Sequence, residues 1–131
     1  LARRLGLVVT IHSGGLLCHA SRIIRLARRH PEVPIIMDHM GFPDSVDEAI
    51  EGAAECPNVY LLTTLLRFFR GQEDTFAPVE VRRAVERLGP ERVVFGSNQP
   101  GDGHPRQRLG LGQAAEDLIF GENLRRIYRL G

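Results

Sequence analysis

The sequence predicts an α/β domain in which parallel strands alternate with helices. Four short apolar runs recur, at residues 7–11, 33–37, 59–62 and 93–95, and each is nearly continuous in hydrophobicity. Runs of this kind are typical of parallel strands that are buried on both faces of a sheet. Helical patterns separate the runs one by one, and strand–helix repeats in this order favour right-handed βα units.

The composition is that of one ordinary globular domain, which we expect to cover residues 1–131. Hydrophobic residues make up 43% of the chain, and 17 basic residues balance 16 acidic ones. A net charge of +1 argues against a nucleic-acid or anionic-membrane surface, because both need a sustained excess of positive charge. No apolar run approaches the roughly 20 residues that span a bilayer. We therefore expect a cytoplasmic protein with neither nucleic acid nor membrane as its partner.

The helices have their own local signals. Residues 1–6 have the pattern of a helix end, and the helices expected further on are 21–29, 45–55, 78–88, 113–120 and 122–130. Ser45 and Glu48 have the spacing of a capping box, in which each end residue satisfies a free backbone donor. The two helical pieces of the tail are expected to be broken at Gly121.

Two architectures fit this order of elements. A doubly wound open sheet normally carries a glycine-rich phosphate-binding turn after an early strand, and Gly14–Gly15 is too short to be one. A (β/α)8 barrel needs about 250 residues, so this chain holds half of one. Because the sequence begins at Leu1 in the middle of a helical phrase, we expect further chain upstream.

Polar side chains follow the apolar runs, where the active site of a parallel α/β protein lies. His12 follows the first run, His39 the second, Thr64 the third and Asn98 the fourth. Alternation along a strand places His39 on the face of Met37 and Ile35, and it turns Asp38 away from that face.

The two histidines are candidate metal ligands. Neutral imidazoles can hold a divalent ion with an open position, where bound water has its pKa lowered to about 7. Two ligands are too few for a catalytic zinc site, which usually takes three from the protein. The alternative is that His12 and His39 are polar strand-end residues bonded to loops.

An ordered set of motifs resembles the amidohydrolase-related family. These motifs are His-Ser-Gly at residues 12–14, His-Pro-Glu-Val-Pro-Ile-Ile-Met-Asp-His-Met-Gly at 30–41, Cys-Pro-Asn-Val-Tyr at 56–60 and Arg-Val-Val-Phe-Gly-Ser-Asn-Gln-Pro at 92–100. Members are (β/α)8 barrels with a divalent metal, typically zinc. They hydrolyse amides or lactones, or decarboxylate small acids. The resemblance implies that this chain is the carboxyl-terminal half of such a TIM barrel, strands five to eight.

The resemblance also implies roles for individual residues. His12 matches the metal-binding histidine of strand five, and His39 matches the strand-six histidine that binds metal or orients the attacking water. Asn98 stands where the family has an aspartate that ligates the metal and transfers the proton. The resemblance therefore makes Asn98 the candidate metal ligand and catalytic residue at this position. A neutral amide cannot act as a base and is a weak ligand, which puts the usual catalysis in doubt.

Three residues are candidates for substrate binding. Thr64 could donate a hydrogen bond to a substrate carboxylate at the strand end, and Arg67 could bind a carboxylate with both arms of its guanidinium. His19 lies near the expected rim and could line a pocket. Each has a structural alternative, as a capping, covering or solvated side chain.

Two functional hypotheses from different classes follow. The first is a metal-dependent hydrolase, or a decarboxylase, that acts on a small organic acid, amide or lactone through metal-activated water, with zinc as the expected ion. The second is a catalytically inactive half-barrel that serves as a binding or oligomerisation module. A lone half-barrel exposes unpaired edges and its inner face, so we expect a homo-oligomer if the chain exists alone. A flavodoxin-like open sheet is a third, weaker possibility.

Overall fold

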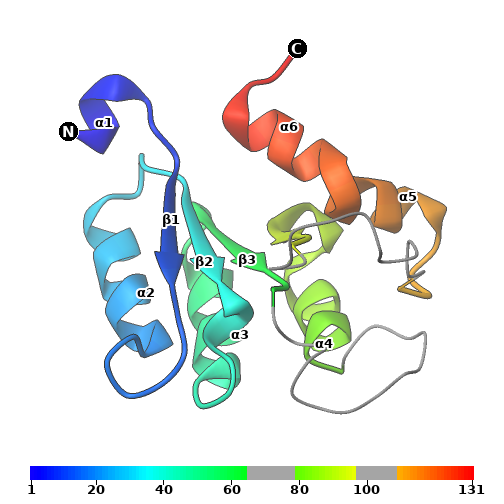
Figure 1. Cartoon of the computed structure of the whole chain (residues 1–131), viewed down its shortest axis with the longest axis horizontal. Helices are drawn as coiled ribbons and strands as arrows, with labels where there is room; N and C mark the ends of the chain where they lie inside the picture. The colour runs from blue at the N-terminus through cyan, green and yellow to red at the C-terminus, as the bar shows by residue number, and fades with distance from the viewer. Residues whose placement is uncertain (65–78, 97–108) are drawn as a thin grey trace.

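The computed structural model describes residues 1–64, 79–96 and 109–131, and its centre is a four-stranded parallel sheet (Figure 1). The strands are β1 (Val9–His12), β2 (Ile35–Asp38), β3 (Val59–Leu62) and β4 (Val93–Val94). They lie side by side in chain order, and every pairing is parallel. The predicted α/β fold is confirmed, and it is consistent with part of a TIM barrel. A doubly wound sheet would reverse its strand order, and the described strands do not.

The first two strands begin later than the apolar runs that predict them. In β1 and β2 the hydrophobic pattern starts at residues 7 and 33, whereas the strands start at Val9 and Ile35. Pro34 explains part of the difference, because it lacks an N–H and its carbonyl accepts the first sheet bond, from the Val9 N–H at 3.0 Å.

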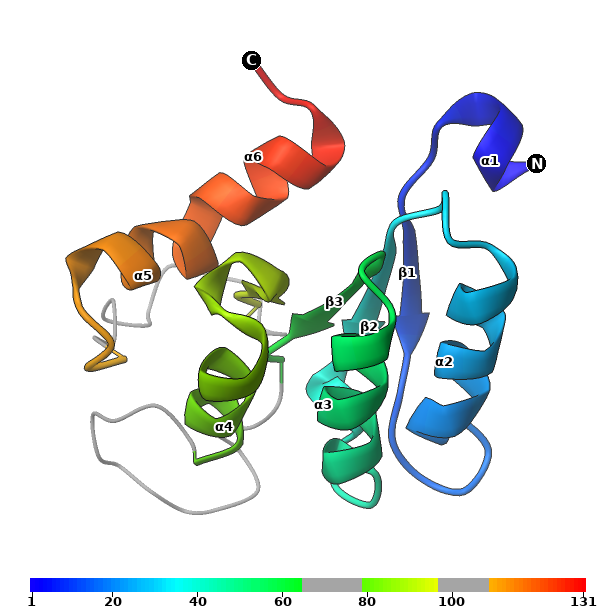
Figure 2. The same ribbon diagram turned by 180° about the vertical axis from the view of Figure 1, so that it is seen from behind.

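Helices follow the strands as the sequence predicts. The α-helices are α1 (Ala2–Leu5), α2 (Ala20–Arg29), α3 (Val46–Glu55), α4 (Val79–Leu88), α5 (Gln113–Asp117) and α6 (Asn123–Tyr128). Short turns of other helix types are η1 (His39–Gly41), η2 (Pro90–Arg92) and the π-helical η3 (Leu118–Glu122). Helices α2, α3 and α4 cover the same face of the sheet (Figures 1 and 2).

Two local predictions are wrong. Ser45 precedes α3 but makes no side-chain cap, because its buried hydroxyl accepts from the Ala20 N–H and donates to the Gly41 carbonyl, both at 3.1 Å. The tail does not break at Gly121, since α5, η3 and α6 follow one another directly. The π-helix η3 connects the two α-helices at this point, and within it the Ile119 carbonyl accepts from the Phe95 N–H at 2.9 Å.

The sheet register assigns every strand residue to one of two faces. Paired residues of parallel strands share a face, so Ile11, Met37 and Leu61 lie together toward the helices. They belong to the main hydrophobic core, which the helices complete. A smaller cluster lies on the opposite face, where Ile36 and Val94 join Ile127 of α6.

Side chains bond backbone carbonyls near the ends at which the strands begin. Asn58 Nδ2 donates to the His30 and Val33 carbonyls at 3.0 and 2.9 Å, next to the end of α2. The Arg92 guanidinium donates to the carbonyls of residues 53, 56 and 59 and lies over the Tyr60 ring, 5.3 Å from its centroid. Burial lowers the pKa of Arg92. These hydrogen bonds connect the helix ends to the sheet. The polar side chains that follow the strands lie at the opposite, carboxyl ends of the strands.

Candidate metal centre

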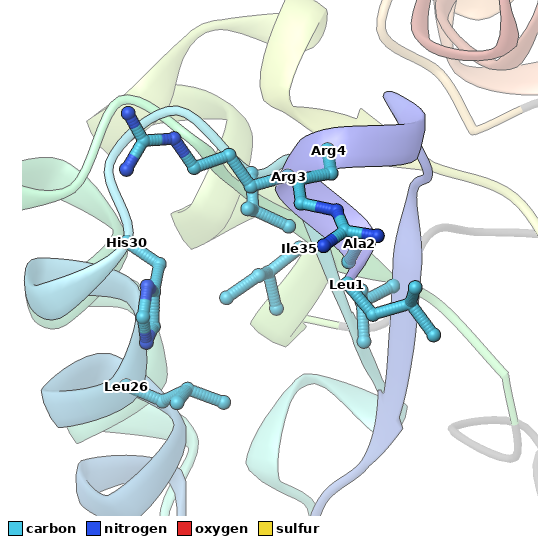
Figure 3. Close-up of a pocket in the computed structure, with 9 residues that line it drawn as sticks. Leu1, Ala2, Arg3, Arg4, Leu26, His30 and Ile35 are labelled. Atoms are coloured by element: carbon cyan, nitrogen blue, oxygen red, sulfur yellow. The ribbon is translucent and has the colours of Figure 1, made fainter.

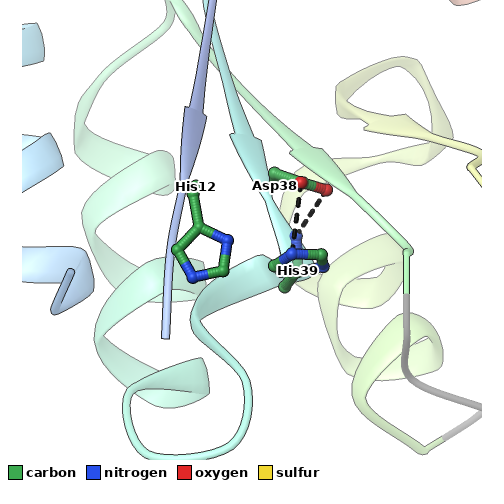
Figure 4. Close-up of side chains that lie close together, drawn as sticks. All are labelled: His12, Asp38 and His39. Carbon is green, nitrogen blue, oxygen red and sulfur yellow. Dashed lines mark hydrogen bonds and ion pairs between the residues drawn. The ribbon is translucent and has the colours of Figure 1, made fainter. Parts of the chain in front are cut away.

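Two histidines and an aspartate meet at the carboxyl ends of the first two strands (Figure 4). His12 ends β1, Asp38 ends β2, and His39 follows directly. Their nearest nitrogen and oxygen ligand atoms all lie within 4.8 Å of one another. The two imidazole rings are nearly perpendicular, at 79°, with centroids 4.8 Å apart.

His39 reaches this cluster through an unusual turn. The backbone of His39, Met40 and Gly41 has positive φ angles of 64°, 52° and 78° in succession. Residues other than glycine rarely adopt this conformation, which costs roughly 1–2 kcal/mol for each of them. The strand conformation therefore ends at Asp38, and alternation along the strand no longer decides where the His39 ring points.

This turn overturns one expectation from the sequence. Met37 and Ile35 pack against the helices, whereas Asp38 is paired with His12 in the sheet and shares its face. Asp38 was expected to point away from His39. Instead its Oδ2 lies 3.2 Å from His39 Nε2.

Ser13 braces the turn from the neighbouring strand end. Its backbone N–H donates to the Asp38 carbonyl at 3.1 Å, its hydroxyl accepts from the Gly41 N–H at 2.7 Å, and that hydroxyl also donates to the Asp38 carbonyl. Gly14 comes next, and a Cβ at this position would lie 1.9 Å from the Phe42 carbonyl oxygen. The loop after β1 can therefore pack against the turn only because residue 14 has no side chain.

Thr64 holds His39 from the other side. Its hydroxyl lies 2.7 Å from His39 Nδ1 and accepts from the His39 backbone N–H at 3.2 Å, and it also donates to Asp38 Oδ1. The Thr64 carbonyl is 3.3 Å from the same Nδ1. His39 and Thr64 are both buried, Asp38 is partly buried and His12 is exposed.

The donor set fits a divalent ion such as zinc. With bonds of about 2.0–2.1 Å in a tetrahedral site, two neighbouring donor atoms on one zinc ion lie about 3.4 Å apart. The 3.2 Å between His39 Nε2 and Asp38 Oδ2 is close to that spacing. Two imidazoles and one carboxylate are also a donor combination that catalytic zinc accepts.

The remaining predicted site residues are placed as follows. His19 caps the start of α2, where its Nδ1 accepts from the Ser21 N–H at 3.3 Å, and this helix end lies at the same edge of the sheet as the cluster (Figure 1). Asn98 and Arg67 lie outside the described residues. Asp38 is the member that reasoning from the sequence missed. The Asp-His pair at the end of an apolar run was its only signal.

A cavity of about 640 Å³ lies elsewhere, at the ends where the strands begin (Figure 3). Its lining is mostly apolar and comes from α1, α2 and the first two strands, with Arg3, Arg4 and His30 at its margin. Neither His12 nor His39 contributes to it. The polar cluster and this cavity are therefore separate features.

Comparisons with known proteins identify the class of this fold. The sequence model of the amidohydrolase family matches residues 1–130, so the chain belongs to that family. No curated protein matches it. None of the described helices has the length and apolar character needed to cross a membrane.

Solved structures share the fold at low sequence identity. An amidohydrolase 2 from Bifidobacterium longum subsp. infantis is 24% identical, with a TM-score of 0.71 over 99% of this chain and 52% of its own. An amidohydrolase from Burkholderia multivorans with bound zinc is 19% identical, with a TM-score of 0.66 over 99% and 55%. A 5-carboxyvanillate decarboxylase from Sphingomonas paucimobilis is 17% identical, with a TM-score of 0.66 over 98% and 51%. The chain spans about half the length of each.

Proposed function

We propose that this chain is the carboxyl-terminal half, strands five to eight, of an amidohydrolase-type (β/α)8 barrel that forms one longer domain. Three observations support this. The strands pair in chain order, helices cover one face of the sheet, and polar side chains gather at the carboxyl ends of the strands. In a (β/α)8 barrel, those strand ends carry the chemistry.

We propose further that the whole protein is a metal-dependent hydrolase, or a decarboxylase, of a small organic acid, amide or lactone. The observation that carries this proposal is the cluster of His12, Asp38 and His39. His12 and His39 would hold a divalent ion, with zinc as the expected one. When bound, such an ion polarises a substrate carbonyl or lowers the pKa of a bound water.

The chain's own residues have defined tasks in this proposal. Asp38 Oδ2 can accept a proton beside His39 Nε2, whereas the amide of Asn98, proposed as a weak ligand of the ion, cannot act as a base. Thr64 and Ser13 hold the turn that carries His39. Arg67 and His19 remain proposed contacts for the substrate, and the cytoplasm remains the proposed location.

The choice between hydrolysis and decarboxylation is part of the proposal. Both activities occur among the names of the similar structures, since some are called amidohydrolases and one a 5-carboxyvanillate decarboxylase. Small acids unite the two classes, because a carboxylate is both the group that a decarboxylase removes and a product of amide or lactone hydrolysis. An arginine such as Arg67 would suit either substrate.

A second candidate is a half-barrel that binds or oligomerises without catalysis. Its support is the exposed face beside β1, where Thr10 and His12 are exposed at the outer strand of the described sheet. A second copy of the chain is the proposed partner in that case. Light scattering tests it: a dimer supports this candidate, and a monomer contradicts it.

Zinc stoichiometry tests the enzyme proposal. The full-length protein is expected to retain about one zinc per chain at neutral pH after removal of loosely bound metal. His12→Ala should lose that zinc. The matched control is His30→Ala, because His30 lies at the margin of the separate cavity and not in the cluster. Absence of retained zinc in the wild-type protein, or equal loss in both variants, contradicts the proposal.

A further inference from the structure

Thr64 is in contact with the buried His39 and the partly buried Asp38 of the cluster. It follows β3 and is only 6% exposed. Its hydroxyl oxygen lies within hydrogen-bond distance of His39 Nδ1, the His39 backbone N–H and Asp38 Oδ1. Its carbonyl oxygen lies within hydrogen-bond distance of the same Nδ1. One residue thus bonds both His39 and Asp38 through its hydroxyl.

The hydrogens around Thr64 can be assigned one by one. A threonine hydroxyl has a single proton, and a carboxylate can only accept, so the proton goes to Asp38 Oδ1. The hydroxyl must then accept from its other two neighbours. The His39 backbone N–H is one donor, and the ring nitrogen Nδ1 has to be the other.

The Thr64 carbonyl leads to the same assignment independently. A carbonyl oxygen only accepts, and this one lies 3.3 Å from His39 Nδ1. Nδ1 therefore carries a hydrogen in its contacts with both the hydroxyl and the carbonyl. In a neutral imidazole the lone pair is then on Nε2. Asp38 Oδ2 lies 3.2 Å from this atom and can also only accept, so the arrangement needs a cation between the two atoms.

We propose that Thr64 is a positioning residue that fixes the Nδ1–H tautomer and the ring orientation of His39, so that Nε2 is the nitrogen offered to a divalent ion. This proposal rests on the proposed function, because the two acceptor atoms Nε2 and Asp38 Oδ2 face one another only with a cation between them. It gives Thr64 a task different from the substrate contact expected from the sequence. A hydroxyl already bonded to Asp38 and His39 has little capacity left for a substrate.

Zinc affinity tests the consequence for the metal. Thr64→Val keeps the shape of the side chain and deletes the hydroxyl, and it should weaken Zn²⁺ binding by the full-length protein about 10–100-fold. Thr64→Ser restores the hydroxyl and should return the affinity close to the wild-type value. The control is Thr63→Val, since the Thr63 hydroxyl accepts from the Gly96 N–H, away from the cluster. Wild-type affinity in Thr64→Val, or no rescue by serine, overturns the proposal.

The tautomer is read directly by ¹⁵N NMR of the histidine rings in the Zn²⁺-loaded full-length protein. His39→Gln identifies the His39 signals. Wild-type His39 should be the Nδ1–H form, and Thr64→Val should shift it toward a mixture. An Nε2–H form in the wild-type protein overturns the assignment, even if the valine variant fails to fold. If the wild-type protein binds no Zn²⁺, the proposed function and this proposal both fail, whereas Zn²⁺ binding with His39 in the Nε2–H form overturns this proposal alone.

Discussion

Replacement of Arg92 by methionine should destabilise the fold more than any change of a surface charge. The guanidinium donates to the carbonyls of Val59, Ala53 and Cys56 at 2.9, 3.1 and 2.7 Å, and two of these carbonyls lie at the end of α3. The positive charge also interacts favourably with the negative, carboxyl-terminal end of the dipole of that helix. Methionine keeps most of the apolar packing of the side chain and removes all of these bonds.

The size of the effect follows from the partners that are lost. A hydrogen bond from a charged group contributes about 1.5–3 kcal/mol, and the bonds share one guanidinium, so they do not add fully. We expect Arg92→Met to lower the free energy of unfolding by about 3 kcal/mol, because the partly buried carbonyls are left without this donor. Urea denaturation followed by circular dichroism measures the change, with the denaturant slope expected to stay constant.

Arg87→Met is the matched control for this experiment. Arg87 pairs with Glu51 at 3.0 Å, but both side chains are more than half exposed, so the unfolding midpoint should hardly move. The reasoning is refuted if Arg92→Met and Arg87→Met unfold at the same urea concentration. It is also refuted if the Arg92 variant unfolds with the wild-type curve.

Three further predictions concern the turn, the tail and the cluster. Gly14→Ala should lower the melting temperature and the zinc content together, because its Cβ would lie 1.9 Å from the Phe42 carbonyl oxygen. In the control Gly15→Ala the new Cβ has no atom within 4 Å, so the melting temperature should fall less. Equal melting temperatures of the two variants would contradict this reasoning. Asn123→Ala should destabilise the protein by about 1–3 kcal/mol in urea denaturation, since the fully buried Asn123 amide donates to two carbonyls at 2.7 and 2.8 Å, and a loss within error of zero would refute its structural role. Asp38→Asn should weaken Zn²⁺ binding, measured by calorimetry, and should leave the melting temperature of the metal-free protein close to that of the wild type. Unchanged Zn²⁺ affinity would remove Asp38 from the site.

The sequence predicted the order of elements well because burial dominates it. The run at residues 59–62 coincides with β3, and the helix patterns agree with α2 and α3 to within a residue. Hydrophobic periodicity records which side chains are buried, so it locates an element. It does not record where sheet bonding starts, which is why β1 and β2 begin two residues late.

The site was only partly predictable for a related reason. His12 and His39 were found because they follow apolar runs. Asp38 was missed because alternation assumes that strand geometry continues, and the positive φ of His39 ends it. Contacts from Ser13 and Thr64, which are distant in sequence, hold that turn. No local pattern carries information of this kind.

X-ray absorption at the zinc edge tests the central claim most directly. The full-length protein, loaded with Zn²⁺, is expected to show only nitrogen and oxygen neighbours, with the multiple scattering of two imidazoles from His12 and His39. A sulfur neighbour at about 2.3 Å would instead place a cysteine thiolate on the ion and contradict the account. Failure of the protein to retain any zinc would contradict it as well.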